Sequence, residues 1–353
     1  MERNLGTFGL ADFFSQRKRK KPMALDGINA MINWTRIEKL LRKKLGRSDE
    51  SKGGASSYPA LLMFKVLLLQ AMYNLSDEAT EEALTDRASF ARFAGLSLDD
   101  DAPDHTTICR FRNLLIQKSL LQKLLDEFNI QMEKQGKLIK KGVALDASVI
   151  ESAARPRKRV TVEEIAEDRE ESELLKPVEY KITTTYSHDT DAAWLKKGKT
   201  FHYGYKIHAV VDSNDGFVLA AHATPANMSD TGQFEQLVRE ANLPENTQIL
   251  ADKGYTSKHN SEILKNHKLQ DGIMARAFRI SPLTPLDKQR NRQISKNRYI
   301  VERAFGTLKE VHGVARASYL GVVKVQAEFL LSAMAYNLKK ALFLCSAQER
   351  CAQ

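Results

Sequence analysis

The sequence predicts an α/β protein in which a helical region precedes a sheet-containing domain. Residues 28–133 follow a helical pattern of apolar positions, and the pattern changes after Gly136. Strand, hairpin, strand, helix, strand and helix then follow, an order typical of α/β folds. We therefore expect four parts: a basic flexible arm (1–27), a helical region (28–135), a sheet-containing domain (136–345) with a charged insertion at about 152–199, and a tail (346–353).

The helical region divides into several short helices. Residues 61–69 are almost entirely apolar, which predicts a buried helix. Ser76 has the composition of an N-cap, with Asp77 and Glu78 in the first turn that follows. Two further short helices are expected at 80–84 and 89–93.

The last part of this region, residues 105–115, is expected to be a helix with one exposed face. Ile108, Phe111 and Leu115 share the apolar face and leave Thr107 and Arg110 accessible. Small helices that end in such a segment resemble a helix-turn-helix reader of DNA. The alternative is an ordinary helical bundle. On the first interpretation the DNA contacts come from one segment: Thr107, Arg110 and Arg112.

The sheet-containing domain begins with a buried strand at 143–150. Residues 155–199 carry 10 Lys/Arg and 10 Asp/Glu, so we expect an exposed insertion or mobile loop there. Residues 201–211 alternate, with Tyr203 and Tyr205 on one face and Lys206 and His208 on the other. The remaining elements are expected as a hairpin turn (212–216), strands (217–224, 248–252 and 272–275) and helices (about 230–241, 295–311 and 326–343).

Charge and composition favour an anionic partner and an intracellular location. The chain of 353 residues has a net charge of +10, and its sequence pI is near 9.3. Residues 1–50 carry 12 Lys/Arg against 6 Asp/Glu, and residues 276–309 carry 9 against 2. The basic run at 17–21 is either a phosphate contact or a solvated tail. Three cysteines, no signal peptide and no uninterrupted apolar span together predict a cytoplasmic protein.

Three acidic residues stand out as candidates for chemistry: Asp146, Asp252 and Glu302. Asp146 interrupts an apolar strand, where an unpaired carboxylate is costly to bury, and Asp252 ends a second apolar strand. Glu302 shares one face of its helix with Arg298 and Lys309. If the three acids converge, their oxygens suit two Mg²⁺ ions, with Mn²⁺ as a substitute, for phosphoryl transfer.

Each of these residues also has a purely structural interpretation. Either aspartate could cap a neighbouring turn, and Glu302 could form only an i,i+4 ion pair with Arg298. A zinc site built on His202 and His208 is a further alternative. Other common catalytic motifs, such as Gly-rich phosphate loops and Cys-His zinc spacings, are not found in the sequence.

Taken together, these residues resemble bacterial insertion-sequence transposases of the DDE type, most closely the family called IS-five. The resemblance covers residues 55–342. Its motifs, in order, are Tyr73-Asn74-Leu75-Ser76-Asp77, Pro103-Asp104-His105-Thr106-Thr107, Leu145-Asp146-Ala147-Ser148, the strand at 202–208, Ala251-Asp252-Lys253-Gly254-Tyr255 and Val301-Glu302-Arg303-Ala304-Phe305-Gly306-Thr307-Leu308-Lys309.

The resemblance implies a ribonuclease-H-like catalytic domain, with a mixed five-stranded sheet flanked by helices, behind an all-α DNA-binding region. The acids of the family fall on Asp146, Asp252 and Glu302. The signature Tyr-x2-Arg-x3-Glu-x6-Lys is matched at Arg298, Glu302 and Lys309, but Ser295 stands at the Tyr position. The resemblance also implies a homodimer that pairs two terminal inverted repeats, cleaves at them and joins the freed ends to target DNA.

Further DNA contacts are expected around these acids. Residues 278–295 are expected to form a short extended excursion over the DNA, and Trp194 either stacks on a displaced base or packs locally. The other expected contacts come from the segments beside the acids: Arg298, Arg303, Lys309, Lys206, His208, Lys253 and Tyr255. Arg298→Ala is expected to weaken DNA binding and lower its salt dependence. The alternatives to an active transposase are a domesticated DNA-binding protein and a ribonuclease-H-like nuclease without strand transfer.

Overall fold

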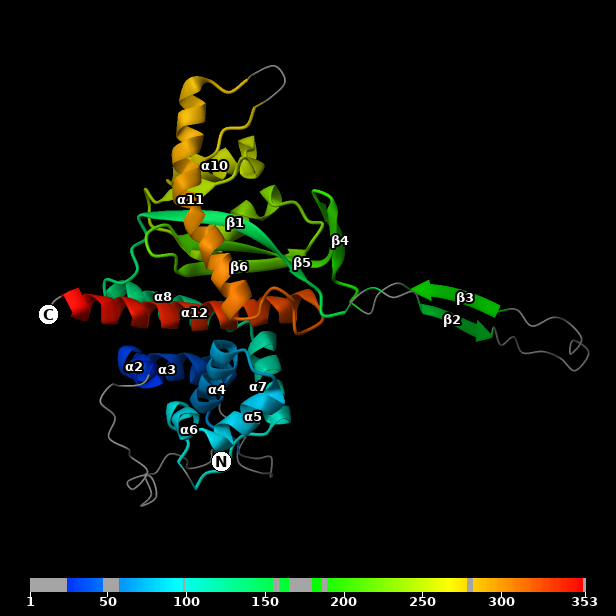
Figure 1. Ribbon diagram of the computed structural model, residues 1–353, viewed down its shortest axis with the longest axis vertical. Helices are drawn as coiled ribbons and strands as arrows, with labels where there is room; N and C mark the ends of the chain where they lie inside the picture. Colours follow the sequence, from blue (N-terminus) through cyan, green and yellow to red (C-terminus); the bar gives the residue numbers. More distant parts are fainter. Residues whose placement is uncertain are drawn as a thin grey trace, which may run out of the picture.

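The computed structural model describes residues 24–46, 57–97, 99–154, 156, 159–164, 180–185, 189–277 and 282–351. A layer of helices lies on one side of a mixed sheet, and one long helix, α12, runs between the two (Figure 1). The basic run at 17–21 lies outside the described residues. The described chain begins with a helix at Ala24, inside the segment expected to be a flexible arm.

The N-terminal region is entirely helical in its described part, as expected. Its helices are α2 (Ala24–Met31), α3 (Trp34–Leu45), α4 (Ala60–Tyr73), α5 (Asp77–Asp86), α6 (Ala88–Ala94), α7 (His105–Gln117) and α8 (Leu121–Lys134). The apolar helix α4 is buried along nearly its whole length, because α3, α5, α6, α7 and α12 surround it. Ser76 is the N-cap of α5, as predicted: its side chain accepts a hydrogen bond from the Ala79 amide at 3.1 Å.

The main sheet has six strands, one more than expected. They are β1 (Gly142–Glu151), β4 (Ala193–Lys197), β5 (Thr200–Asp212), β6 (Val218–Pro225), β7 (Gln248–Ala251) and β8 (Gln270–Ile273). The order is β4-β5-β1-β7-β8, and β6 also pairs with β5. Strands β1, β5 and β6 are antiparallel neighbours, whereas β1, β7 and β8 are parallel.

The extra strand comes from the charged insertion, which is more ordered in its described part than expected. Strand β4 extends the sheet by pairing with the first part of β5. Strands β2 (Arg159–Glu164) and β3 (Tyr180–Thr185) form a separate antiparallel pair that projects away from the body (Figure 1). Mixed charge does not prevent β structure here, because backbone pairing needs no apolar core.

Besides strands β7 and β8, the described elements after β6 are 3-10 turns and helices. They are η2 (Thr231–Gln233), α9 (Phe234–Ala241), η3 (Lys253–Tyr255), α10 (Lys258–Asn266), α11 (Pro285–Val311) and α12 (Val322–Cys351). The expected excursion at 278–295 is wrong from Pro285 onward, because α11 begins ten residues before Ser295. Thr284 and Asp287 form a capping box, and Pro285 occupies the first turn. Helix α12 also runs beyond its expected end, through Cys351.

Helix α12 joins the two regions of the molecule. It packs on α4, α8 and β6, and its side chains are buried along most of the contact. The Asn337 side chain accepts from the Val218 amide at 2.9 Å and donates to the Val218 carbonyl at 2.8 Å and to Asn129 at 3.0 Å. This buried triad connects α12, β6 and α8.

The fold class predicted from the sequence is confirmed. The structure is a mixed α/β fold with a mixed sheet flanked by helices, and an all-helical region precedes it. Among the described residues, no helix has both the length and the apolar character required to span a membrane.

Candidate active site

Asp146 and Asp252 lie at equivalent positions along two neighbouring parallel strands. Asp146 lies within β1, and Asp252 directly follows β7. The register pairs Ala144 of β1 with Leu250 of β7, and each aspartate follows two residues later. Parallel neighbours lie about 4.8 Å apart, so the backbones at these two positions are close. Asp252 is also the N-cap of η3, where its Oδ1 accepts from the Lys253 amide at 2.6 Å.

Helix α11 brings Glu302 to the same edge of the sheet. The helix crosses β1, β5 and β7, and Val301, Phe305 and Leu308 are among the side chains that it buries (Figure 1). Glu302 is exposed beside this apolar stripe. The charges of Glu302 and Asp252 both raise the pKa of Asp146, so each of these two carboxyl groups lies within electrostatic reach of Asp146.

Asp146 forms an ion pair with Arg298. Its Oδ1 lies 3.2 Å from the guanidinium of Arg298, whose side chain is 9% exposed. Burial raises the pKa of Asp146; Arg298 and the Ala147 amide oppose this effect, while Glu302 and Asp252 add to it. Arg298 is therefore an internal cation that neutralises Asp146, and its Nε has no hydrogen-bond partner among the described residues.

The three carboxylates fit a divalent cation in charge and donor chemistry. Oxygen ligands suit Mg²⁺ and Mn²⁺, and mutual repulsion among carboxylates is relieved by a bound cation. Within the described ranges, however, no three His, Cys, Asp or Glu side chains are grouped closely enough to hold a metal ion. A bound metal would therefore require the three carboxylates to move closer together than they are in this structure.

Several expected DNA contacts are buried in this structure, which contradicts that role for them in this conformation. Arg298 is engaged by Asp146, and Tyr255 is 2% exposed beneath the candidate site. Lys206 donates to Asp230 and to the Met228 carbonyl, both at 2.8 Å. His208 is fully buried and contacts Thr224 at 3.0 Å.

Lys206 and His208 also lie on the sheet face opposite Asp146. The β1–β5 register pairs His208 with Ala147 and Asp146 with Ala209. Directly paired residues share a face and neighbours alternate, so the Lys206 and His208 side chains point away from the acid. Sequence alternation grouped Lys206 and His208 correctly, but only the strand register shows which face holds Asp146.

In the helical region Arg112 is a structural residue and not an available DNA contact. It is 3% exposed, its guanidinium contacts Asp77 and Gln70, and it lies over the ring of Tyr319 at 4.9 Å. The sequence suggests a DNA-reading face, but the structure gives Arg112 a partly buried carboxylate partner, Asp77, within the helical region. Arg110, by contrast, is exposed.

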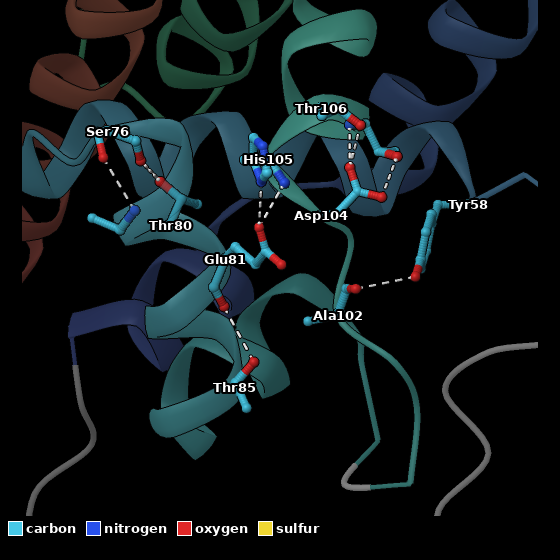
Figure 2. A network of polar contacts seen from close by, with 11 residues as sticks. Tyr58, Ser76, Thr80, Glu81, Thr85, Ala102, Asp104, His105 and Thr106 are labelled. Carbon is cyan, nitrogen blue, oxygen red and sulfur yellow. Dashed lines mark hydrogen bonds and ion pairs between the residues drawn. The ribbon is translucent and has the colours of Figure 1, made fainter.

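The segment before α7 is a helix cap that ties α7 to α5 (Figure 2). Asp104 caps α7: it accepts from the Thr107 amide at 2.7 Å, and the hydroxyls of Thr106 and Thr107 donate to it. Glu81 of α5 accepts from the His105 amide at 2.8 Å and lies 2.9 Å from its ring. Thr107 is therefore engaged in capping, and acidic groups surround the helix end expected to contact bases.

Outside the helical region, four of the expected DNA contacts are accessible or partly accessible. Lys253 and Arg303 are exposed next to Asp252 and Glu302. Lys309 is partly buried and donates to the Val149 carbonyl at 2.8 Å. Trp194 is 55% exposed and lies against Tyr203, with ring centroids 5.2 Å apart.

Sequence reasoning missed a buried carboxylate that fixes the insertion to the domain. Asp189 is 1% exposed and accepts from Ser152 and, at 2.5 Å, from Tyr205. The Gly321 amide donates to Tyr205 at 2.9 Å, which connects this group to the turn between α11 and α12. No periodic pattern marks Asp189, because it lies in a charged stretch.

Two protein-family models match the chain. Residues 139–338 match the model described as Transposase DDE domain, and residues 13–114 match the model described as Transposase domain (DUF772). The transposase for insertion sequence element IS1106 from Neisseria meningitidis serogroup B is 40% identical over 237 residues, which is 66% of this chain and 76% of that protein.

Solved structures share weaker similarity. A piggyBac transposase synaptic complex with hairpin DNA matches with a TM-score of 0.45 at 12% identity and covers 94% of this chain and 77% of that one. A Mos1 mariner paired-end complex with Mn matches with a TM-score of 0.21 at 11% identity, over 96% and 90% of the two chains. The assignment therefore depends on the sequence matches, which cover more than half of the chain: the protein belongs to the DDE transposase family.

Proposed function

We propose that this DDE transposase binds the terminal inverted repeats of an insertion sequence and catalyses metal-dependent DNA cleavage and strand transfer. The observation that supports it best is the placement of Asp146 and Asp252 at equivalent register positions of two adjacent parallel strands, Asp146 within β1 and Asp252 directly after β7, with Glu302 of α11 in electrostatic reach of Asp146. The sequence motifs further favour membership of the IS-five family, with DNA as substrate and a homodimer as the active form.

Asp146, Asp252 and Glu302 are the proposed metal ligands and catalytic residues. Two Mg²⁺ ions, or Mn²⁺, would supply activation of the attacking oxygen and stabilisation of the leaving oxygen. The two aspartates lie on neighbouring strands of the sheet, and the glutamate lies on a helix that packs across these strands. Arg303 and Lys253 are exposed beside the acids and are proposed to contact phosphates.

The proposed reaction has two phosphoryl transfers in one site. In the first, a water oxygen forms a bond to phosphorus, the bond to the 3′ oxygen breaks, and a 3′ hydroxyl and a 5′ phosphate result. In the second, that 3′ hydroxyl attacks a target phosphodiester and displaces a target 3′ hydroxyl. Neither step needs an oxidant or reductant.

The test is a cleavage and strand-transfer assay with purified protein, Mg²⁺ and labelled DNA that carries the terminal repeats of the element. Wild-type protein should nick at the ends and join them to target DNA, and Glu302→Gln should lose both activities by at least about 100-fold. Leu286→Ala is a matched control, since Leu286 is 78% exposed on the same helix.

Two results would replace this proposal with a specific alternative. End binding without cleavage under either Mg²⁺ or Mn²⁺ would identify a domesticated DNA-binding protein. Cleavage without joined product would identify a nuclease. Cleavage by Glu302→Gln at the wild-type rate would exclude Glu302 from the catalytic site.

A further inference from the structure

A pocket at the far end of β1 has walls made largely of aromatic rings. Its volume is about 310 Å³, in the range of small-molecule sites. Two strands of the sheet and the segment after β1 line it, with Trp194, Phe201, Tyr203, Glu151, Ser152, Ala154 and Pro156.

The aromatic side chains of this pocket are unusually exposed. Trp194 is 55% and Phe201 is 61% accessible, and Trp194 packs against Tyr203 at a tilt of 54°. Lys196 lies 5.4 Å from the Phe201 ring centroid. Isolated exposed apolar residues need no explanation, but three rings gathered around one cavity indicate a binding surface.

Strand register places these rings on the sheet face that carries Asp146. Trp194 pairs with Tyr203 and Lys196 pairs with Phe201. On β1, Asp146 and Glu151 are five residues apart, so their side chains lie on opposite faces of the sheet. Glu151 pairs with Gly204 of β5. Tyr203 and Phe201 lie one and three residues from Gly204, so their side chains lie on the Asp146 face. Glu151 lies five residues beyond Asp146, about 17 Å away at about 3.3 Å per residue.

One cationic side chain lies between the candidate acids and the pocket, and another lies at the outer end of the pocket. Lys309, seven residues after Glu302 on α11, bonds to the Val149 carbonyl of β1 at 2.8 Å. Lys197, at the end of β4, pairs with Thr200, one residue farther from Asp146 than Phe201. A DNA strand that has its reacting phosphate at Glu302 could place following phosphates near these lysines.

We propose that this pocket binds one unstacked nucleobase of a DNA strand that leads away from the cleavage site. Flat aromatic rings beside a lysine match the faces of a base and the charge of its phosphate. Three polar groups of the wall are already engaged: Glu151 lies 3.4 Å from His202, the Ser152 hydroxyl donates to Asp189, and the Tyr203 hydroxyl donates to the Asp189 carbonyl at 2.6 Å. The pocket therefore accepts bases with little preference for sequence. The inference rests on DNA being the substrate, as proposed above.

The chain offers a direct reporter, because it contains two tryptophans, Trp34 and Trp194. Trp34 lies within the helical region against Phe93 and Phe128. Subtracting the emission of Trp194→Phe from that of wild type isolates the Trp194 signal. Full-length metal-free protein is titrated with a ten-nucleotide single-stranded thymidine oligonucleotide and, separately, with an abasic strand that has the same number of phosphates.

The thymidine strand should quench the Trp194 signal at least about 2-fold, and the abasic strand should leave it unchanged. Phe201→Leu should weaken binding of the thymidine strand by about 5-fold or more, because one stacking surface is lost. Leu286→Ala, an exposed apolar change on α11, should bind as wild type does. Equal thermal midpoints of the variants exclude misfolding as the cause.

Equal quenching by the abasic strand would overturn the proposal, because phosphates alone would then explain the signal. Unchanged affinity in Phe201→Leu would also overturn it. The titration needs no catalysis, so failure of the cleavage assay would not affect its outcome. Asp146→Asn should keep the full quenching, which separates the pocket from the catalytic proposal.

Discussion

The ion pair between Arg298 and Asp146 changes the role expected for the arginine. The pair lies 3.2 Å apart, and the arginine is nearly fully buried. Sequence spacing predicts Arg298 on a cationic face with Lys309, which suggests a phosphate contact. Burial in the structure instead makes Arg298 the counter-ion of a candidate metal ligand.

Arg298→Ala should lower the free energy of unfolding by about 1–3 kcal/mol near neutral pH, because Asp146 loses its charged partner. The double variant Arg298→Ala/Asp146→Asn should recover most of that loss, since a neutral amide needs no counter-ion. Urea denaturation of wild type, Arg298→Ala, Asp146→Asn and the double variant measures both effects. Additive losses in the double variant would show that the pair is not coupled.

The burial of Arg298 also changes the expectation for DNA binding. In metal-free protein, Arg298→Ala should leave the slope of log affinity against log salt concentration unchanged, because a buried arginine neutralises no phosphate. Arg303→Ala, an exposed position on the same helix, is the comparison and should reduce the slope by about 1. A reduced slope in Arg298→Ala would restore the phosphate contact expected from the sequence.

His208 should make the fold sensitive to acid. Burial lowers its pKa from 6.5 to about 4, while Asp230 opposes this effect and Lys206 and His222 add to it. The unfolded chain therefore binds a proton below pH 6.5 that the folded chain refuses until about pH 4. Stability is complete above pH 6.5 and falls as the pH decreases through this window.

Between pH 7.5 and pH 5 the wild type should lose about 2 kcal/mol more than His208→Asn, at about 1.4 kcal/mol per pKa unit. Urea unfolding at the two pH values gives the difference directly. His222, whose pKa is also lowered by burial, is present in both proteins and cancels. Equal losses in the two proteins would mean that His208 does not resist protonation in the fold.

Among the helices, α11 both extends beyond the sheet and packs across it. Its first turns project beyond the sheet layer before the helix crosses β1 (Figure 1). Thr284 accepts from the Asp287 amide at 3.1 Å, and Asp287 accepts from the Thr284 amide at 3.0 Å. Asn291 adds two hydrogen bonds to the backbone of Ala275, so the start of the helix is held to the end of the sheet.

Thr284→Ala should destabilise the protein by about 1 kcal/mol, because the amides of the first turn lose their cap. Thr284→Ser should retain most of the stability, since it keeps the hydroxyl. Hydrogen exchange of the amides at 286–290 should accelerate in the alanine variant and not in the serine variant. Equal exchange in both variants would show that Pro285 and packing alone set the start of α11.

At the scale of the whole molecule, α12 makes the helical region and the sheet domain one cooperative unit. Asn337 bonds to both backbone groups of Val218 and to Asn129, so three elements share one buried polar group. The turn before α12 is fixed on its other side by Tyr205 and by His312, which contacts the Ala71 carbonyl at 3.0 Å. Separate unfolding of either region would leave these groups unpaired.

Unfolding followed by Trp34 in the helical region and by Trp194 on β4 should therefore give the same midpoint. Each is measured in the single-tryptophan variant that lacks the other, Trp194→Phe and Trp34→Phe. Asn337→Ala should lower both midpoints together, because buried partners are left unsatisfied. The corresponding loss in the free energy of unfolding is about 1–3 kcal/mol. Two separated midpoints would show that the regions fold independently.

The sequence by itself determined the fold class, the order of elements and which residues to suspect. Apolar periodicity located the helices and the buried strands, because period and burial are local properties of the chain. An acid within an apolar strand identified Asp146 and Asp252, since such a placement is costly without a reason. The start of α11 is also encoded locally, because Thr284, Pro285 and Asp287 form a capping signal. The basic composition of the same segment favours an extended excursion instead, and that expectation is wrong from Pro285 onward.

Only the tertiary structure decided which suspected residues are free to act. Burial of Arg112, Lys206 and His208 depends on partners far away in sequence, namely Asp77, Asp230 and Thr224. The face on which a strand residue lies is fixed by pairing register, which local pattern leaves open. The pocket of Trp194, Phe201 and Tyr203 likewise exists because β4 pairs with β5, and a charged stretch gives no periodic sign of that pairing.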